Sequence, residues 1–258
     1  MKTIVLLMLL LLSHGCALKK FAIDHADNLI THQVNKRLPL NTEQEQQLDK
    51  DVDRFLNDSK PLAREILKIL KEVSFEAPEK LEDQYSQLEK DYVKIAANFS
   101  AMVSRPMARL DKEQQKSFFK RLKEEQKRVE KQQNEDDRKK RFQERFKFFL
   151  GSMNSSQEKL LSEYEEYFKE RSGLRISRRM DLSDKLKTIF EKEVPLEMKE
   201  ELITEAFKNY QKKSLTGNKN LEMLKKLIPT LSTEQKDHFK QKKKEIQGLL
   251  EYFILKTY

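Results

Sequence analysis

Apolar residues recur at intervals of three, four and seven along most of the chain, the spacing that places them on one face of an α-helix. The longest uninterrupted example comprises Leu81, Tyr85, Leu88, Tyr92, Ile95, Phe99 and Met102. Similar stripes predict helices within residues 23–34, 48–56, 62–73, 118–129, 142–150, 160–168, 182–190, 202–210, 219–228 and 239–253. Pro61 and Pro106 are expected to end helices, and Gly173 has the position of a glycine just beyond a helix end.

The composition supports a wholly helical chain. Only 5 Gly and 6 Pro occur among 258 residues, which leaves little material for β-turns, and Lys, Glu, Gln and Leu are abundant. Apolar and charged residues each make up 37%, enough for helical stripes but not for a thick core. We therefore expect an all-α fold, an elongated antiparallel multi-helix bundle. No Ser/Gly-rich linker divides residues 16–258, so they are predicted to form one domain.

Residues 130–141 contain no apolar residue, and the stripe resumes only after them. Such a segment is either a helix that projects into solvent or a break between two helices. Because it lacks Gly and Pro, one long, partly exposed helix is favoured. Its candidate recognition residues, which would form a projecting arm, are Glu130, Arg138, Lys139, Lys140 and Arg141, with the flanking Phe142 and Phe146.

The first 15 residues have the pattern of an export signal. A lysine precedes an apolar run at residues 4–12, which is too short to span a bilayer, and small Gly15 precedes the single cysteine, Cys16. This arrangement resembles the lipobox of bacterial lipoproteins. The resemblance implies cleavage between Gly15 and Cys16 and attachment of fatty acyl groups such as palmitate to Cys16. The alternative is a free thiol behind an ordinary cleaved signal peptide.

The residues after Cys16 bear on the membrane to which such a protein is attached. Ala17, rather than Asp, resembles lipoproteins sorted to the outer membrane. We accordingly expect a chain anchored in the inner leaflet of the outer membrane that faces the periplasm. Lys19 and Lys20 are then predicted to lie at the lipid headgroups, where each basic residue adds about 1 kcal/mol against anionic lipid.

The net charge of the chain and its distribution indicate which classes of partner it can bind. Lys and Arg number 52 and Asp and Glu 43, for a net charge of +9, and the two signs alternate rather than forming a basic stripe. An exported protein does not meet nucleic acid, so we expect no nucleic-acid partner. Anionic lipid, lipopolysaccharide or an acidic protein surface remain as electrostatic partners.

One motif recurs four times, as "LNTEQ", "LDKEQ", "MNSSQ" and "LSTEQ". Each combines an apolar residue, a helix N-cap residue and a glutamine three residues after the N-cap, the layout of a capping box. The four sets are Leu40, Asn41 and Gln44; Leu110, Asp111 and Gln114; Met153, Asn154 and Gln157; and Leu231, Ser232 and Gln235. They can be four stable helix starts. They also resemble the LTxxQ motif of Spy/CpxP-like periplasmic proteins, which implies an envelope-stress chaperone or sensor.

A second resemblance covers residues 21–56. This segment is similar to the start of a family of bacterial helical lipoproteins of unassigned function, with a short gap after the lipobox, a first helix and then an "LxxEQ" motif. The resemblance implies a lipidated, all-helical envelope protein, and it implies no catalytic residues.

Candidate catalytic chemistry is sparse. His25 and His32 lie on one predicted helix face, but two histidines two turns apart cannot chelate one ion without a third ligand such as His238. The sequence has no HExxH, GxSxG or phosphate-loop motif. We expect no catalytic residue, metal or cofactor. The favoured function is non-catalytic binding of another envelope component, and the alternatives are a chaperone or stress sensor and a cell-wall or lipid-processing enzyme.

Overall fold

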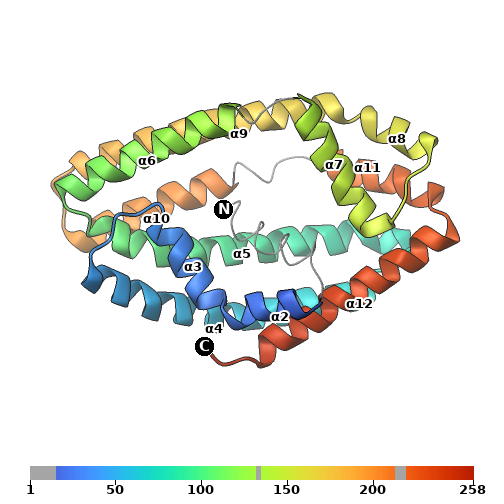
Figure 1. Cartoon of the computed structure of the whole chain (residues 1–258), viewed down its shortest axis with the longest axis horizontal. Helices are drawn as coiled ribbons and strands as arrows, with labels where there is room; N and C mark the ends of the chain where they lie inside the picture. The colour runs from blue at the N-terminus through green and yellow to red at the C-terminus, as the bar shows by residue number, and fades with distance from the viewer. Residues whose placement is uncertain (1–15, 132–134, 213–218) are drawn as a thin grey trace.

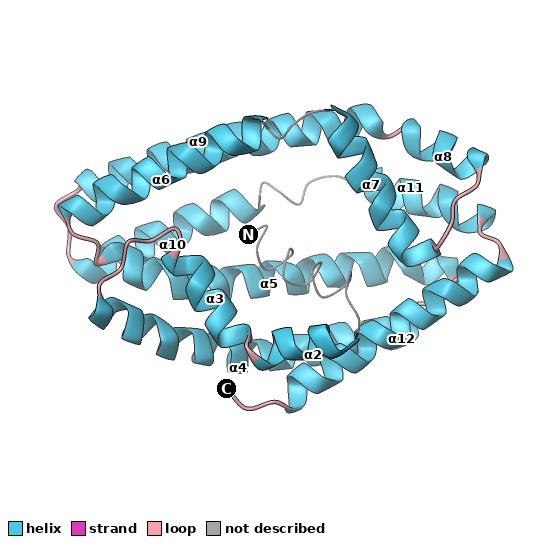
Figure 2. Cartoon of the chain, viewed as in Figure 1, coloured by secondary structure: helices cyan, strands magenta, loops and turns pink. Residues whose placement is uncertain are grey.

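The computed structural model describes residues 16–131, 135–212 and 219–258, and within these ranges every regular element is a helix (Figures 1 and 2). The all-α prediction is confirmed. In chain order the elements are α2 (Cys16–Asp24), α3 (Ala26–Asn35), α4 (Thr42–Glu72), η1 (Pro78–Lys80), α5 (Leu81–Ala108), α6 (Lys112–Lys131), α7 (Glu135–Leu150), α8 (Ser155–Ser162), α9 (Glu165–Glu191), α10 (Leu196–Lys212), α11 (Lys219–Leu227), η2 (Ile228–Thr230) and α12 (Thr233–Leu255).

The long helices form an elongated ring (Figure 1). Along one side α4 and α12 pack together, and along the opposite side α6 and α9 do so. Helix α5 contacts both α4 and α10, and α10 continues the contacts to α9. Helix α7 closes one end of the ring by packing against α12.

The buried apolar side chains form one large cluster and two small ones. The large cluster draws on α3, α4, α5, α6, α9 and α10, and Leu48, Val52 and Ile203 in it are completely buried. The small clusters lie around Leu150 and Leu161 and draw mainly on α7, α8 and α11. The predicted stripes therefore face inward, as amphipathic helices require.

The helices do not end at Pro61, Pro106 or Gly173, where the sequence predicts helix ends. Helix α4 continues through exposed Pro61, and Pro106 lies in the last turn of α5. In α4 the buried stripe runs on both sides of the proline, so packing outweighs the one backbone hydrogen bond that proline removes. Gly173 lies inside α9, and among the described glycines the positive φ belongs to Gly151, directly after α7.

The charged middle segment does not form the single long helix that we favoured. Helix α6 ends at Lys131, α7 begins at Glu135, and the two run in different directions (Figure 1). Phe146 is half-buried against both small clusters, so it does not belong to a projecting arm. The other candidate arm residues have side chains outside the described part of the structure, namely Glu130, Arg138, Lys139, Lys140, Arg141 and Phe142.

The start of α2 also differs from expectation. Lys19 is only 2% exposed and forms an ion pair with Glu245 of α12, so its predicted place at the lipid headgroups is wrong. Lys20 is exposed, with its ammonium 5.4 Å from the centre of the Tyr252 ring. The Lys19–Glu245 pair holds α2 against the body of the protein.

The predicted membrane anchor lies largely outside the residues that the structure describes. Gly15 and the side chain of Cys16 are not among the described residues. Of the helices that are described, none is long and apolar enough to cross a membrane.

Candidate functional site

All four predicted capping boxes are present. In each, the N-cap side chain accepts a hydrogen bond from the backbone N–H of the glutamine, and the glutamine Oε1 accepts one from the N-cap backbone N–H. The pairs are Asn41 with Gln44, Asp111 with Gln114, Asn154 with Gln157 and Ser232 with Gln235. The helix starts are thereby satisfied locally.

The structure joins these helix starts in pairs, which we call glutamine clasps. Gln44 and Gln114 form one clasp, in which each amide donates to the other's Oε1, at 3.3 and 2.7 Å. Gln157 and Gln235 form the other, at 2.9 Å in both directions. Each amide also donates to the carbonyl oxygen two residues before the partner's N-cap; these acceptors are Arg109, Pro39, Thr230 and Ser152.

The two clasps lie at opposite ends of the ring. One joins the starts of α4 and α6, and the other joins the starts of α8 and α12 (Figure 1). Gln157 is completely buried and Gln235 is 6% exposed, so their amides are occupied within the protein. The recurrent motif thus determines the architecture of the chain, and the candidate binding site has to be sought elsewhere.

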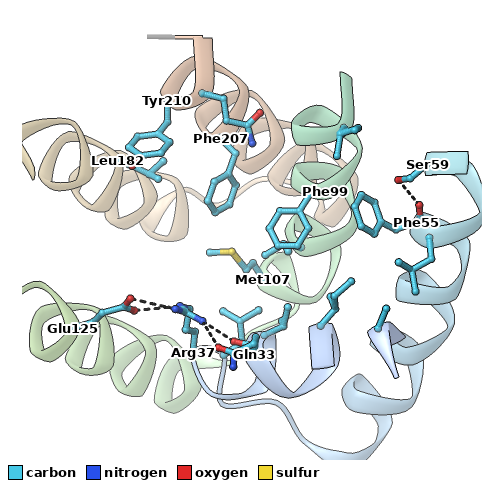
Figure 3. Close-up of a pocket in the computed structure, with 18 of the residues that line it drawn as sticks. Gln33, Arg37, Phe55, Ser59, Phe99, Met107, Glu125, Leu182, Phe207 and Tyr210 are labelled. Carbon is cyan, nitrogen blue, oxygen red and sulfur yellow. Dashed lines mark hydrogen bonds and ion pairs between the residues drawn. The ribbon is translucent and has the colours of Figure 1, made fainter. Parts of the chain in front are cut away.

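Inside the ring lies a cavity of about 460 Å³, within the range of roughly 300–1,000 Å³ that is typical of ligand sites. Its walls come from α2, α3, α4, α5, α6, α9, α10 and α12. They are predominantly apolar, and the larger side chains include Phe55, Phe99, Met107, Leu182 and Phe207 (Figure 3), together with Phe253.

The local sequence explains why α5 lines the cavity on one side only. Phe99, Val103 and Met107 follow one another at intervals of four residues and face the interior. An adjacent face of α5 carries small Ser100, which is buried and accepts a hydrogen bond from Gln211 of α10 at 2.6 Å. Small residues there let α10 approach closely, while the large residues face the cavity.

Charged side chains gather at one part of the cavity wall. Arg37, just after α3, donates two hydrogen bonds of 3.2 Å to the carboxylate of Glu125 on α6 (Figure 3). A third, of 2.9 Å, goes from Arg37 to the backbone oxygen of Gln33. Arg179 of α9 also lines the cavity. Burial by itself raises the pKa of Glu125, but the charge and hydrogen bonds of Arg37, together with the charge of Arg179, bring that pKa below its ordinary value.

The lowered pKa predicts a pH-dependent contribution of Glu125 to stability. A carboxyl whose folded-state pKa is depressed stabilises the fold above its unfolded pKa, about 4.3, and loses that effect as the pH falls through the folded value. Glu125→Gln should therefore lower the free energy of unfolding more at pH 7 than at pH 3, measured by urea denaturation. The exposed neighbour Glu124 supplies the control, because Glu124→Gln should have a small effect at both pH values. A loss for Glu125→Gln that is equal at both would contradict the prediction.

The charged residues of the cavity were not singled out from the sequence. Arg37 and Glu125 are 88 positions apart, and each stands among other charged residues. Their positions next to inward apolar residues, Leu38 and Leu122, are the one local indication that they approach the interior.

The histidines are placed apart in the structure. The ring of His25 lies against that of Phe21, with ring centres 4.3 Å apart and the planes tilted by 53°. His32 is exposed on α3, and a ring nitrogen of His238 lies 3.1 Å from the carbonyl oxygen of Phe148. Among the described residues no group of three His, Cys, Asp or Glu side chains could hold a metal ion.

The arrangement as a whole is suited to holding an apolar molecule beside charged groups. Its inner surface provides burial for hydrocarbon, and the charged residues provide a defined polar end. Comparison of the chain with protein-family models, with curated proteins and with solved structures finds no match.

Proposed function

We propose that this protein is a non-catalytic, lipid-anchored protein of the bacterial cell envelope that binds an acyl-chain-bearing molecule of that envelope. The observation that carries the proposal is the apolar cavity of about 460 Å³ inside the ring of helices. The envelope location is supported by the lipoprotein-like pattern of the first 16 residues.

The size of the hydrophobic effect makes such binding feasible. Each methylene transferred from water into apolar surroundings gains about 0.8 kcal/mol, so roughly ten methylenes gain about 8 kcal/mol. Association costs at least about 4 kcal/mol, so these methylenes leave at most about 4 kcal/mol, which corresponds to roughly millimolar affinity. Binding in this range is sufficient for a lipid that is concentrated at a membrane surface.

Site-specific photocrosslinking in cells tests the proposal with the full, lipidated chain. The photoreactive amino acid p-benzoylphenylalanine replaces Phe99, whose ring lies at the cavity (Figure 3). After irradiation, the protein is expected to carry an adduct with the mass of a lipid, detected by mass spectrometry. The same amino acid at Leu174, which is 57% exposed on α9, is the control and should give no such adduct.

Filling the cavity should prevent this capture. Leu182→Trp places a larger side chain in the cavity wall and is expected to reduce the lipid adduct at position 99 at least about tenfold, a change of about 1.4 kcal/mol in binding. Leu174→Trp, the same substitution on the exposed part of α9, should leave the adduct unchanged. An adduct that persists in Leu182→Trp, or no lipid adduct at position 99 in the wild-type background, would refute the proposal.

A further inference from the structure

The charges at the polar end of the cavity do not cancel. Arg37 and Arg179 face it with one carboxylate, Glu125. All three guanidinium nitrogens of Arg37 already donate, to both oxygens of Glu125 and to Gln33. The ion pair of Arg37 and Glu125 is therefore neutral as a unit, and one positive charge, that of Arg179, remains.

Arg179 has an unused hydrogen-bonding capacity. It is half-buried, and within the described part of the chain it forms no hydrogen bond and no ion pair closer than 4.0 Å, although its charge acts on Glu125. A guanidinium presents five N–H donors in a fixed planar arrangement that matches carboxylate and phosphate oxygens. Because Arg179 is partly buried, fewer water molecules can accept its hydrogen bonds, and binding an acceptor from a ligand is therefore more favourable than it is for a fully exposed arginine.

The position of Arg179 on α9 connects this cation to the apolar wall. Leu182, Ser183 and Leu186 follow it at the third, fourth and seventh positions, and all of them line the cavity. Residues with this spacing share one face of a helix. A molecule whose hydrocarbon lies against Leu182 and Leu186 would thus place its end group near Arg179.

We propose that the ligand of the cavity is an amphiphile with one acyl chain and one anionic head group, a carboxylate or a phosphate, which forms an ion pair with Arg179. The inference rests on the proposed function and specifies its ligand class. One unneutralised cation favours an anionic over a neutral head group. A cationic head group is disfavoured, because Glu125 is already paired with Arg37.

Three photoreactive probes with the same diazirine-bearing alkyl chain test the head group: a carboxylic acid, a neutral alcohol and an amine. Each is added to the purified full-length lipidated protein in phosphatidylcholine nanodiscs, and labelling of cavity peptides is measured by mass spectrometry relative to labelling of the lipid. The acid is expected to label the wild-type cavity about tenfold more than the alcohol, the factor supplied by one charge-assisted hydrogen bond. Arg179→Gln should abolish this preference and leave labelling by the alcohol unchanged.

The control is Arg175→Gln, which removes the same charge from an exposed position one turn earlier on α9 and should preserve the preference. Equal labelling by acid and alcohol in the wild-type protein, or a preference for the amine, would overturn the assignment of an anionic head group while leaving the cavity as a lipid site. Absence of cavity labelling by all three probes would instead overturn the proposed function itself. A preference that survives Arg179→Gln would show that another residue binds the head group.

Discussion

Replacing Gln157 with alanine is expected to lower the free energy of unfolding by about 2–4 kcal/mol. The side chain is completely buried and serves the backbone N–H of Asn154, the carbonyl oxygen of Thr230 and the amide of Gln235. Its removal takes one hydrogen bond from the Asn154 N–H and one from the Thr230 carbonyl, and it leaves the Gln235 amide only its bonds to Ser152 and Ser232. Each buried group left unsatisfied costs about 1–3 kcal/mol. Urea denaturation followed by circular dichroism measures the loss.

The surface residue Gln241 on the same clasp's helix, α12, provides the matched control. It is exposed, so Gln241→Ala should change the free energy of unfolding by no more than about 0.5 kcal/mol. A double-mutant cycle of Gln157→Ala and Gln235→Ala should show a combined loss smaller than the sum of the single losses by at least about 1 kcal/mol, because both remove the same paired amides. Strict additivity would mean that the clasp does not act as a unit.

Arg105→Ala is expected to cost about 2–3 kcal/mol of unfolding free energy. Arg105 on α5 lies 2.6 Å from the carboxylate of Asp51 on α4, whose side chain is 3% exposed, and 3.6 Å from Glu200 on α10. It thereby links three helices around the large core cluster. Removing it leaves a buried carboxylate without its closest cation, and breaking a buried ion pair in this way is strongly destabilising.

Two further variants separate charge from packing at this site. Arg54 also contacts Asp51, at 3.3 Å, but its side chain is 61% exposed. Arg54→Ala should therefore cost less than about 1 kcal/mol. In the Arg105→Ala background, Asp51→Asn removes a buried carboxylate whose remaining cation is the exposed Arg54, and it should restore about 1 kcal/mol or more of the lost stability. If Asp51→Asn deepened the loss instead, the role assigned to Arg105 would be wrong.

The balance of local and non-local forces explains which helix boundaries could be predicted. Capping boxes use residues three apart, so their presence at Asn41, Asp111, Asn154 and Ser232 can be deduced from the sequence. Whether a helix breaks at Pro61 or Gly173 depends instead on non-local packing. The helix continues if burial of the surrounding apolar stripe outweighs the unfavourable helix propensity of the proline or glycine. Nothing within a few residues of Pro61 decides that, because the helices that cover α4 come from elsewhere in the chain.

The burial and the partners of individual charged residues could likewise not be predicted from the neighbouring sequence. The position of Lys19 next to a predicted lipid anchor predicts a membrane-facing charge, yet Lys19 is buried and forms an ion pair with Glu245, 226 residues away. The same applies to Arg37, Glu125 and Arg179, which are ordinary helix-surface residues in the sequence. They acquire a candidate role only because α3, α6 and α9 bring them to one cavity.

By itself, the sequence of this protein determined the fold class, the inward faces of most helices and the four capped helix starts. Each of these follows from the 3.6-residue helical repeat or from hydrogen bonds between residues three positions apart. Only the tertiary structure decided that glutamines 70 and 78 residues apart would join in two clasps, that the helices would close into a ring, and that the ring would enclose an apolar cavity with a charged end. Those features depend on contacts between distant segments, whose pairing is selected by the packing of the whole chain rather than by any one stretch of it.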